Sequence, residues 1–219
     1  MVKKSVLITG TSRGLGKHLA DVFGGAGYSV LPHRGRMDGD LRDGATFTDL
    51  VSLAVDYDID ILINNAGVYI NKPFSEMTAE EFREVIDINL LAVINLTNAV
   101  WPIFKRKKSG TVVFINSVAG KRGSSGESAY CASKFGLKGF ADSLRYDGLR
   151  DGVRVVSVFL GAMETDMTKN KGKDPKHNID PLNVAKIILN LCRDYTRAEI
   201  TEITIDKIPT KIITDDQFI

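Results

Sequence analysis

The sequence contains few side chains that could form disulfide bridges or bind a metal ion. It has two cysteines, Cys131 and Cys192, and three histidines, which lie far apart as His18, His33 and His177. Two cysteines in a chain of this size are typical of reduced thiols in the cytoplasm and do not build a disulfide scaffold. No two histidines have the spacing of zinc ligands, so we predict a cytoplasmic protein without a metal site.

The sequence also lacks a strong excess of charge and a long apolar run. Lys and Arg number 29 against 27 Asp and Glu, a formal net charge of +2. A chain this close to neutral is not expected to bind nucleic acid or membrane surfaces in general. No apolar run approaches the roughly 18 residues of a membrane-spanning helix, and the N-terminus has no apolar signal segment. We therefore predict no nucleic-acid partner and no membrane partner.

One basic cluster, Lys-Arg-Lys-Lys, covers residues 105–108 immediately before Ser109 and Gly110. A helix is expected to end there, and cations suit the negative end of the helix dipole. A patch for a phosphate backbone is the alternative interpretation.

Segments with the pattern of strands alternate with segments with the pattern of helices. Apolar runs predict strands near residues 6–9, 28–33, 59–63, 111–115, 153–160 and 200–205. A 3.6-residue apolar period predicts helices near residues 15–23, 47–54, 78–104, 128–150 and 181–191. This alternation is typical of an α/β protein with a doubly wound, largely parallel sheet of the Rossmann type and helices on both faces. Because the sequence shows neither repeats nor a linker, we predict a single domain over residues 1–219.

The stretch 4–26, KSVLITGTSRGLGKHLADVFGGA, organises this pattern. An apolar strand ends at Thr9 and Gly10, and Gly14 and Gly16 follow before an amphipathic helix. Gly10 permits a tight turn, and glycine at the other two positions leaves room for a pyrophosphate or for close packing of helix on sheet. The free N–H groups at the start of the helix attract an anion. The spacing G-x-x-x-G-x-G therefore predicts a nucleotide site, with a flexible glycine loop as the alternative.

Four polar or small segments follow strands of the predicted sheet, namely residues 9–16, 64–67, 117–126 and 161–168. In an open parallel sheet, ligands bind outside the carboxyl ends of the strands. We expect the four segments to converge on one edge of the sheet and to share one site.

Tyr130 and Lys134 stand four residues apart on a predicted helix, so their side chains point to the same face. A free tyrosine titrates near about 10, and an adjacent ammonium would lower the pKa of the phenol toward neutral pH. Ser117 precedes Tyr130 across a short loop. Two hydroxyls beside an ammonium could hold and protonate a carbonyl oxygen while a hydride reaches its carbon. A serine that only caps a turn is the alternative interpretation.

These motifs together resemble those of the short-chain dehydrogenase/reductase family. The family's glycine motif, its Asn-Asn-Ala-Gly, its catalytic Ser and its Tyr-x-x-x-Lys are all matched in the family's order. Its active-site Asn, at which a helix is kinked, and its Asp near the adenine are matched as well. The matching positions are Thr9-Gly10-x-x-x-Gly14-x-Gly16, Asp40, Asn64 to Gly67, Asn89, Ser117, Tyr130 and Lys134, and the resemblance covers about residues 4–205.

The resemblance implies an NAD(P)H-dependent oxidoreductase that interconverts a carbonyl and a secondary alcohol by hydride transfer. It implies that Tyr130 exchanges the proton and that Lys134 lowers its pKa and binds the nicotinamide ribose. Ser117 would orient the substrate oxygen, and Asn89 would hold a water that passes the proton outward. The implied cofactor contacts are Gly10, Ser12, Arg13, Gly14, Leu15, Gly16, Arg34, Asp40, Leu41, Asn65, Ala66, Gly67, Tyr130, Lys134, Gly161 and Thr165.

Charges after the second predicted strand favour NADP over NAD. A sheet of this type that prefers NAD places Asp or Glu there, against the ribose 2′-hydroxyl. This chain has Arg34, with His33 and Arg36 beside it, and Arg13 inside the glycine turn. Arginine suits bidentate contact with the 2′-phosphate of NADP. Arginines that are only solvated loop charges are the alternative.

The chain departs from the family pattern at three places. The proline usual before Gly161 is Leu160, and the connection from Arg34 to Asp40 is so short that we expect a helix common there to be absent. The C-terminal end lacks the usual Gly-Gly after the last strand, which weakens the inference of a tetramer. The long helices around Asn89 and Tyr130 remain candidates for subunit packing in a homodimer or homotetramer.

The sequence leaves the small-molecule carbonyl or alcohol substrate open. The expected pocket walls fit a 3-oxoacyl thioester, a keto sugar or a small ketone; they are Val118, Ala119, Gly120, Ser124, Ser125 and residues 162–167. The basic stretch 169–176 could meet an acidic carrier or a phosphorylated substrate, or form a solvated lid. An NADP-binding sensor or scaffold of the same fold, without turnover, is the alternative function. The complete set of four catalytic residues argues against it.

Overall fold

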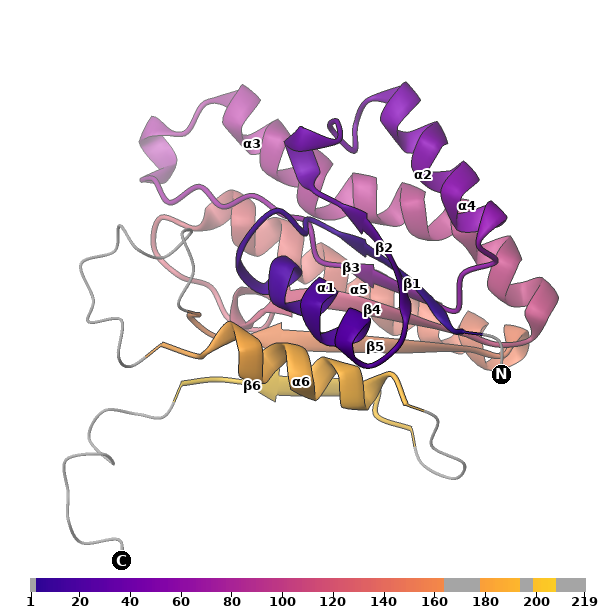
Figure 1. Ribbon diagram of the computed structural model, residues 1–219. Coiled ribbons are helices and arrows are strands. Elements are labelled where there is room, and N and C mark those ends of the chain that lie inside the picture. The colour runs from indigo at the N-terminus through magenta and orange to yellow at the C-terminus, as the bar shows by residue number, and fades with distance from the viewer. Residues whose placement is uncertain (1–2, 164–177, 194–198, 208–219) are drawn as a thin grey trace, which may run out of the picture.

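Six parallel strands form one sheet at the centre of the molecule (Figure 1). The structure is a computed structural model and describes residues 3–163, 178–193 and 199–207. The strand order is β2-β1-β3-β4-β5-β6. The strands are β1 Ser5–Thr9, β2 Ser29–His33, β3 Ile61–Asn64, β4 Gly110–Ser117, β5 Val153–Leu160 and β6 Glu202–Ile205. The predicted parallel α/β sheet is confirmed.

The order of the strands reverses at β1. The chain runs from β1 outward to β2 and then returns to place β3 on the other side of β1, with Val6 opposite both Val30 and Ile61. After β1 the chain crosses to α1 on one face of the sheet, and after β3 it crosses to the helices on the other face, so a crevice is expected at the carboxyl ends of these strands. β2 is an edge strand, and it tolerates Pro32 because its outer N–H groups need no partner strand.

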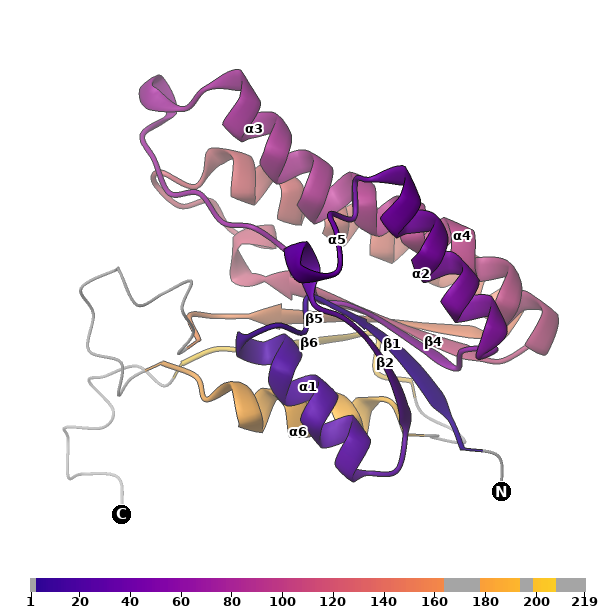
Figure 2. The ribbon, with the colours of Figure 1, turned by 45° about the horizontal axis from the view of Figure 1, so that its top comes forward.

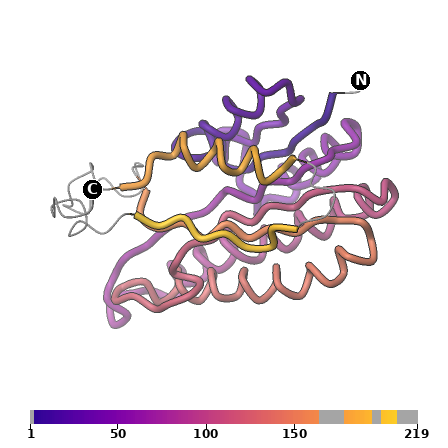
Figure 3. The backbone as a smooth tube through the Cα atoms, turned by 90° about the horizontal axis from the view of Figure 1, so that it is seen from below, coloured from indigo at the N-terminus to yellow at the C-terminus, as the bar shows by residue number. Residues whose placement is uncertain are grey.

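Helices cover both faces of the sheet, as Figure 2 shows with the sheet seen nearly edge-on. On one face α2 (Gly44–Asp56), α4 (Ala92–Lys107) and α5 (Ser128–Asp151) bury Leu50, Leu96 and Leu137 against the strands. On the other face α1 (Gly14–Gly25) and α6 (Pro181–Leu191) bury their apolar sides in a second core. Figure 3 shows β6 (yellow) beside β5 at the edge of the sheet remote from β2.

Local signals in the sequence account for several helix boundaries. Thr78 accepts a hydrogen bond from the Glu81 N–H, and the Glu81 carboxylate accepts one from the Thr78 N–H, so a capping box starts α3 (Ala79–Ile86). Gly152 ends α5 with a φ of 78°, the left-handed conformation that favours glycine. Pro181 opens α6 behind an Asp180 cap. These three boundaries are confirmed within one residue of the predicted ones.

The predicted long helix through Asn89 is continuous but contains a π-helical turn. α3 leads into a π turn over Asp87–Leu91, and α4 follows directly. A π turn widens the helix by one residue and is often found at functional sites. The whole helix, Ala79–Lys107, is 29 residues long and by length and composition could cross a membrane. Because Val93, Leu96 and Phe104 are buried against the sheet, we interpret it as a core helix.

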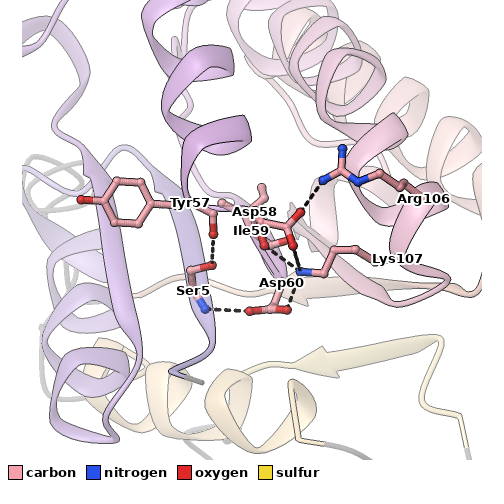
Figure 4. A network of polar contacts seen from close by, with 7 residues as sticks. All are labelled: Ser5, Tyr57, Asp58, Ile59, Asp60, Arg106 and Lys107. Atoms are coloured by element: carbon pink, nitrogen blue, oxygen red, sulfur yellow. Dashed lines mark hydrogen bonds and ion pairs between the residues drawn. The ribbon is translucent and has the colours of Figure 1, made fainter. Parts of the chain in front are cut away.

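The basic cluster at the end of α4 holds together the amino ends of the strands (Figure 4). Lys107 Nζ donates to the carbonyl oxygens of Asp58 and Ile59 and lies 2.7 Å from Asp60 Oδ1. The same Asp60 carboxylate accepts the Ser5 N–H at 2.8 Å. Arg106 pairs with Asp58 at the surface. The cluster thus lies at the end of a helix, as predicted, and also forms ion pairs with Asp58 and Asp60.

The connection between β2 and α2 contains only a short 3-10 turn, Gly35–Met37. The predicted absence of a helix there is confirmed. β4 extends farther than the predicted 111–115 and ends on Ser117 itself. This extension places the Ser117 hydroxyl at the carboxyl edge of the sheet.

Candidate active site

The four predicted segments, the last of them as far as Met163, meet at the carboxyl ends of the strands around one crevice of about 1110 Å³. Its walls include every predicted cofactor contact that the structure describes, together with the serine, the tyrosine and the lysine. These residues are Gly10, Ser12, Arg13, Gly14, Leu15, Gly16, Arg34, Asp40, Leu41, Asn65, Ala66, Gly67, Ser117, Tyr130, Lys134 and Gly161. Thr165, the expected pocket walls 164–167 and the basic stretch 169–176 lie outside the described residues.

The glycine turn is built by close approach of two loops. Gly10 has a φ of 74°, and a Cβ on Gly16 would collide with the Gly10 carbonyl oxygen. Asn65 Nδ2 donates to the Thr9 carbonyl at 2.8 Å, and Thr9 Oγ1 accepts the N–H groups of Asn65 and Ala66 at 3.0 Å each. The β1 and β3 loops are thereby fixed to each other.

This turn suits the phosphates of a dinucleotide. α1 begins at Gly14 without a side-chain cap, and its first residues, Gly14, Leu15 and Gly16, line the crevice, so their N–H groups are available to an anion. Farther along, buried His33 Nδ1 has no hydrogen-bond partner among the described residues, while its Nε2 lies 3.0 Å from the Gly39 oxygen. An orphaned polar atom in the crevice wall fits a site whose ligand supplies the missing partner.

Ser117 is held by the backbone of Ala119 and by the side chain of Asn116, a residue that no predicted motif included. Its Oγ accepts the Ala119 N–H at 3.1 Å, which leaves the hydroxyl proton available for another acceptor. Asn116 Oδ1 accepts the Ser117 N–H at 2.8 Å, and its Nδ2 donates to the Lys134 carbonyl at 3.2 Å. Asn116 is buried and joins β4 to α5. Its position next to Ser117 was the only sequence signal for this role.

Lys134 and Tyr130 lie on one face of α5, as predicted. Lys134 is buried, and its Nζ donates to the Ile115 carbonyl at 2.9 Å and lies 5.7 Å from the centre of the Tyr130 ring. Burial lowers the pKa of Lys134 to about 8.

The titration of Tyr130 differs from our prediction. Burial raises the pKa of Tyr130 to about 12, although a hydrogen bond with Ser117 acts in the opposite direction. The predicted net lowering by Lys134 is therefore contradicted for the protein alone. The physical reason is that desolvation penalises the phenolate, while the ammonium is itself desolvated and turned toward the Ile115 carbonyl.

Asn89 lies in the π turn, as the predicted kink requires, but it does not line the crevice. Its Oδ1 accepts the Val68 N–H and its Nδ2 donates to the Val68 carbonyl, both at 2.8 Å, and also to Ser133 Oγ at 3.3 Å. The side chain thus fixes the loop after β3 against α5. The predicted water-holding role stays a prediction.

Two further residues of the crevice wall were missed, Tyr69 and Glu127. The Tyr69 ring packs edge-on against the Tyr130 ring with centroids 4.9 Å apart. The Tyr69 hydroxyl donates to Glu127 Oε1 at 2.5 Å. Nothing in the sequence spacing links a tyrosine after β3 to a glutamate before α5.

Val118, Ala119, Ser124 and Met163 line the crevice, as expected for the substrate side. Gly120 and Ser125 do not. A Cβ on Gly120 would lie 2.8 Å from the Lys134 carbonyl oxygen, so Gly120 serves the packing of the 3-10 turn Val118–Gly120 on α5.

The arginines at the other end of the crevice are paired with carboxylates. Arg34 donates to Asp38 Oδ1 from Nε at 2.8 Å and from Nη2 at 2.5 Å, which holds the pKa of Asp38 below its usual range. Arg36 pairs with Glu84 at 2.9 Å. The Arg42 guanidinium lowers the pKa of Asp40 to about 2.

Arg13 is exposed and forms no ion pair with the described residues. Among the residues that the structure describes, no three His, Cys, Asp or Glu side chains come together as a metal site would require.

A comparison with models of known protein families shows to which family the chain belongs. Residues 36–176 match the model of the short chain dehydrogenase family. The chain belongs to this family. It is an oxidoreductase of the short-chain dehydrogenase type, and the family binds NAD(P).

Curated relatives agree with this assignment. The chain is 30% identical over 195 residues to the 3-oxoacyl-[acyl-carrier-protein] reductase FabG of Escherichia coli, covering 80% of each chain. It is 32% identical over 184 residues to the acetoacetyl-CoA reductase of Paracoccus denitrificans, covering 76% of each. It is also 30% identical over 216 residues to the peroxisomal hydratase-dehydrogenase-epimerase of Saccharomyces cerevisiae, but spans 24% of that longer protein.

Solved structures share the fold at lower identity. A 4-hydroxyisoleucine dehydrogenase mutant complexed with NADH and succinate is 23% identical with a TM-score of 0.85, and the match covers 95% of this chain and 99% of that one. A metagenomic short-chain oxidoreductase in complex with NADP is 24% identical with a TM-score of 0.77, covering 94% and 98%. Proteins of this fold thus occur in complex with either cofactor.

Proposed function

We propose that this protein is an NADP(H)-dependent reductase that interconverts a carbonyl and a secondary alcohol, with Tyr130 as the acid and base. One observation carries the proposal: Ser117, Tyr130 and Lys134 meet in the crevice that also contains the glycine turn. A reduced nicotinamide would supply the hydride there. The protein would then have only to hold the carbonyl oxygen and to donate a proton to it.

The roles follow from what each side chain has available. The Ser117 hydroxyl proton, which faces Tyr130 in the protein alone, can be donated to the substrate oxygen, so Ser117 holds and polarises that oxygen. Tyr130 is protonated at neutral pH and donates its proton to that oxygen as the alkoxide forms. Lys134 stands one helical turn away and stabilises the phenolate that remains. Asn89 holds the loop after β3 in place.

The preference for NADP rests on Arg13 and Arg34. Arg13 is exposed at the start of α1 and meets no carboxylate among the described residues. Arg34 lies where β2 ends but is engaged by Asp38, so a 2′-phosphate would have to replace that carboxylate. Since the phosphate carries more charge than Asp38, the exchange favours NADP.

The substrate class follows from the named relatives. Both bacterial relatives bear the names of enzymes that reduce a 3-oxoacyl thioester. Small and apolar side chains at Val118, Ala119 and Met163 suit the acyl part of such a substrate. Keto sugars and small ketones are the competing classes for the assay.

The test is oxidation of NADPH, followed by absorbance, with acetoacetyl-CoA, keto sugars and small ketones. We expect the thioester to give the highest kcat/KM. Tyr130→Phe should lower kcat by about 10² to 10⁴-fold and leave the Kd of NADPH unchanged, because only the proton donor is removed. Turnover retained by Tyr130→Phe would contradict the proposed role, and tight cofactor binding without turnover of any carbonyl would favour a sensor or scaffold.

We also propose a cytoplasmic homodimer or homotetramer without nucleic-acid or membrane partners. The apolar side chains Leu91, Phe135, Tyr146 and Leu149 are exposed around α4 and α5, with 46–63% of their surface accessible. An apolar surface of this kind is typical of an interface between copies. Phe135→Glu should lower the mass measured by sedimentation, and an unchanged mass would contradict this assembly.

A further inference from the structure

The Tyr130 ring is held from one side by the loop that follows β3. Tyr69 packs its ring edge against the Tyr130 ring, with an interplanar angle of 84°. The preceding residue, Val68, is fixed through both of its backbone polar groups by Asn89. Such an edge-to-face pair stabilises a defined orientation of both rings.

The position of Tyr69 is in turn fixed by Glu127. The Tyr69 hydroxyl donates to Glu127 Oε1 at 2.5 Å. Glu127 stands directly before α5, three residues ahead of Tyr130, and its carbonyl accepts the Cys131 N–H at 2.7 Å. The two loops also meet where the Lys72 N–H donates to the Gly126 carbonyl at 2.9 Å. Glu127 and Tyr69 therefore bridge two segments that lie on either side of the phenol.

Glu127 lines the same crevice and brings a negative charge toward the phenol. Its charge disfavours the phenolate, as do the neighbouring Tyr69 and Cys131 groups. Ser117, on β4, favours the phenolate by a hydrogen bond. Lys134, farther along α5, lies with its ammonium 5.7 Å from the centre of the ring. Some neighbours of Tyr130 thus favour its phenolate, and others favour its protonated phenol.

We propose that Tyr69 and Glu127 form a positioning pair that fixes the orientation of the Tyr130 ring and keeps its phenol protonated until a substrate oxygen accepts the proton. This inference rests on the proposed role of Tyr130 as proton donor. The ring of Tyr69 orients the Tyr130 ring, and the carboxylate of Glu127 supplies the negative charge. The hydrogen bond between Tyr69 and Glu127 holds both side chains in place.

The titration of Tyr130 can be followed without turnover. A fluorinated tyrosine with a more acidic phenol is incorporated at position 130 of the full chain, and its ¹⁹F resonance is recorded against pH. Glu127→Gln keeps a hydrogen-bond acceptor for Tyr69 but removes the charge, and it should lower the pKa of the reporter by about half a unit to one unit. Glu81→Gln is the matched control, because Glu81 pairs with Lys72 and does not act on Tyr130.

Kinetics then separate charge from orientation. With a carbonyl substrate, Glu127→Gln should move the alkaline limb of the kcat/KM profile to lower pH, and Glu127→Asp should restore it. Tyr69→Leu removes the ring and should lower kcat about tenfold or more at unchanged KM for NADPH, whereas Tyr69→Phe keeps the ring and should lose less.

An unchanged ¹⁹F titration in Glu127→Gln, or an equal shift in Glu81→Gln, would overturn the inference. So would equal kcat values for Tyr69→Leu and the unmodified protein, provided that thermal unfolding shows both to be folded. The ¹⁹F result stands apart from the proposed function, because it reports the phenol itself. A protein with the expected shift but no carbonyl substrate would refute the proposed function alone.

Discussion

Lys134 should reduce the stability of the protein at neutral pH, and replacing it with methionine should reveal by how much. Its ammonium is buried, and burial lowers the pKa of Lys134 from 10.5 to about 8. Because of this difference, the charged lysine lowers the free energy of unfolding by about 3 kcal/mol. Lys134→Met removes the charge and keeps a side chain of similar length.

The sign of the effect sets its dependence on pH. Below about pH 8 the lysine is charged in the folded and the unfolded chain, so the burial cost is complete. Between about 8 and 10.5 the folded protein has released the proton while the unfolded chain still binds it, so stability rises with pH. Above pH 10.5 the lysine is neutral in both states, so burying it no longer costs this electrostatic free energy. From pH 7 to pH 10.5 the original protein should therefore gain about 3 kcal/mol relative to Lys134→Met.

The measurement is urea unfolding of both proteins, without added nucleotide, at several pH values in this range. The hydrogen bond to the Ile115 carbonyl is lost in the variant at every pH, so it changes the offset and not the slope. Lys138→Met is the control on the same helix, because the partner Asp142 raises the pKa of Lys138 and should give a small slope of the opposite sign. A stability difference for Lys134→Met that stays constant with pH would refute the reasoning.

Two more predictions concern opposite ends of the sheet. Lys107→Met should lower the unfolding free energy by about 2 kcal/mol, since it leaves backbone carbonyls and a carboxylate without their partner. Arg106→Met removes only a surface ion pair and should lower the unfolding free energy by less than about 0.5 kcal/mol. Urea unfolding measures both, and equal losses would contradict the network in Figure 4. Asp38→Asn frees Arg34 and should strengthen binding of 2′,5′-ADP about two- to tenfold while leaving 5′-AMP unchanged. Calorimetry measures this, and an unchanged Kd would show that Arg34 does not contact the phosphate.

Most of the fold could be predicted because its signals are local. The strand over residues 153–160, the capping box at Thr78 and the proline start at Pro181 depend only on neighbouring residues. The spacing of the glycine motif is local as well, because a Cβ on Gly16 would meet the Gly10 carbonyl oxygen, although a Cβ on Gly10 would meet Ala66 of the loop after β3. For the same reason the residues of the crevice could be named before their geometry was known.

What the sequence by itself determined is the order of the elements, the edge of the sheet where the loops gather and the presence of Ser117, Tyr130 and Lys134 among them. Only the tertiary structure decided how Tyr130 and Lys134 titrate and which side chains hold Tyr130 in place. Burial, which raises the pKa of Tyr130 and lowers that of Lys134, is a property of packing and has no sequence motif. The same holds for the contact of Tyr69 with Glu127, because 58 residues separate two side chains that the fold brings within one hydrogen bond.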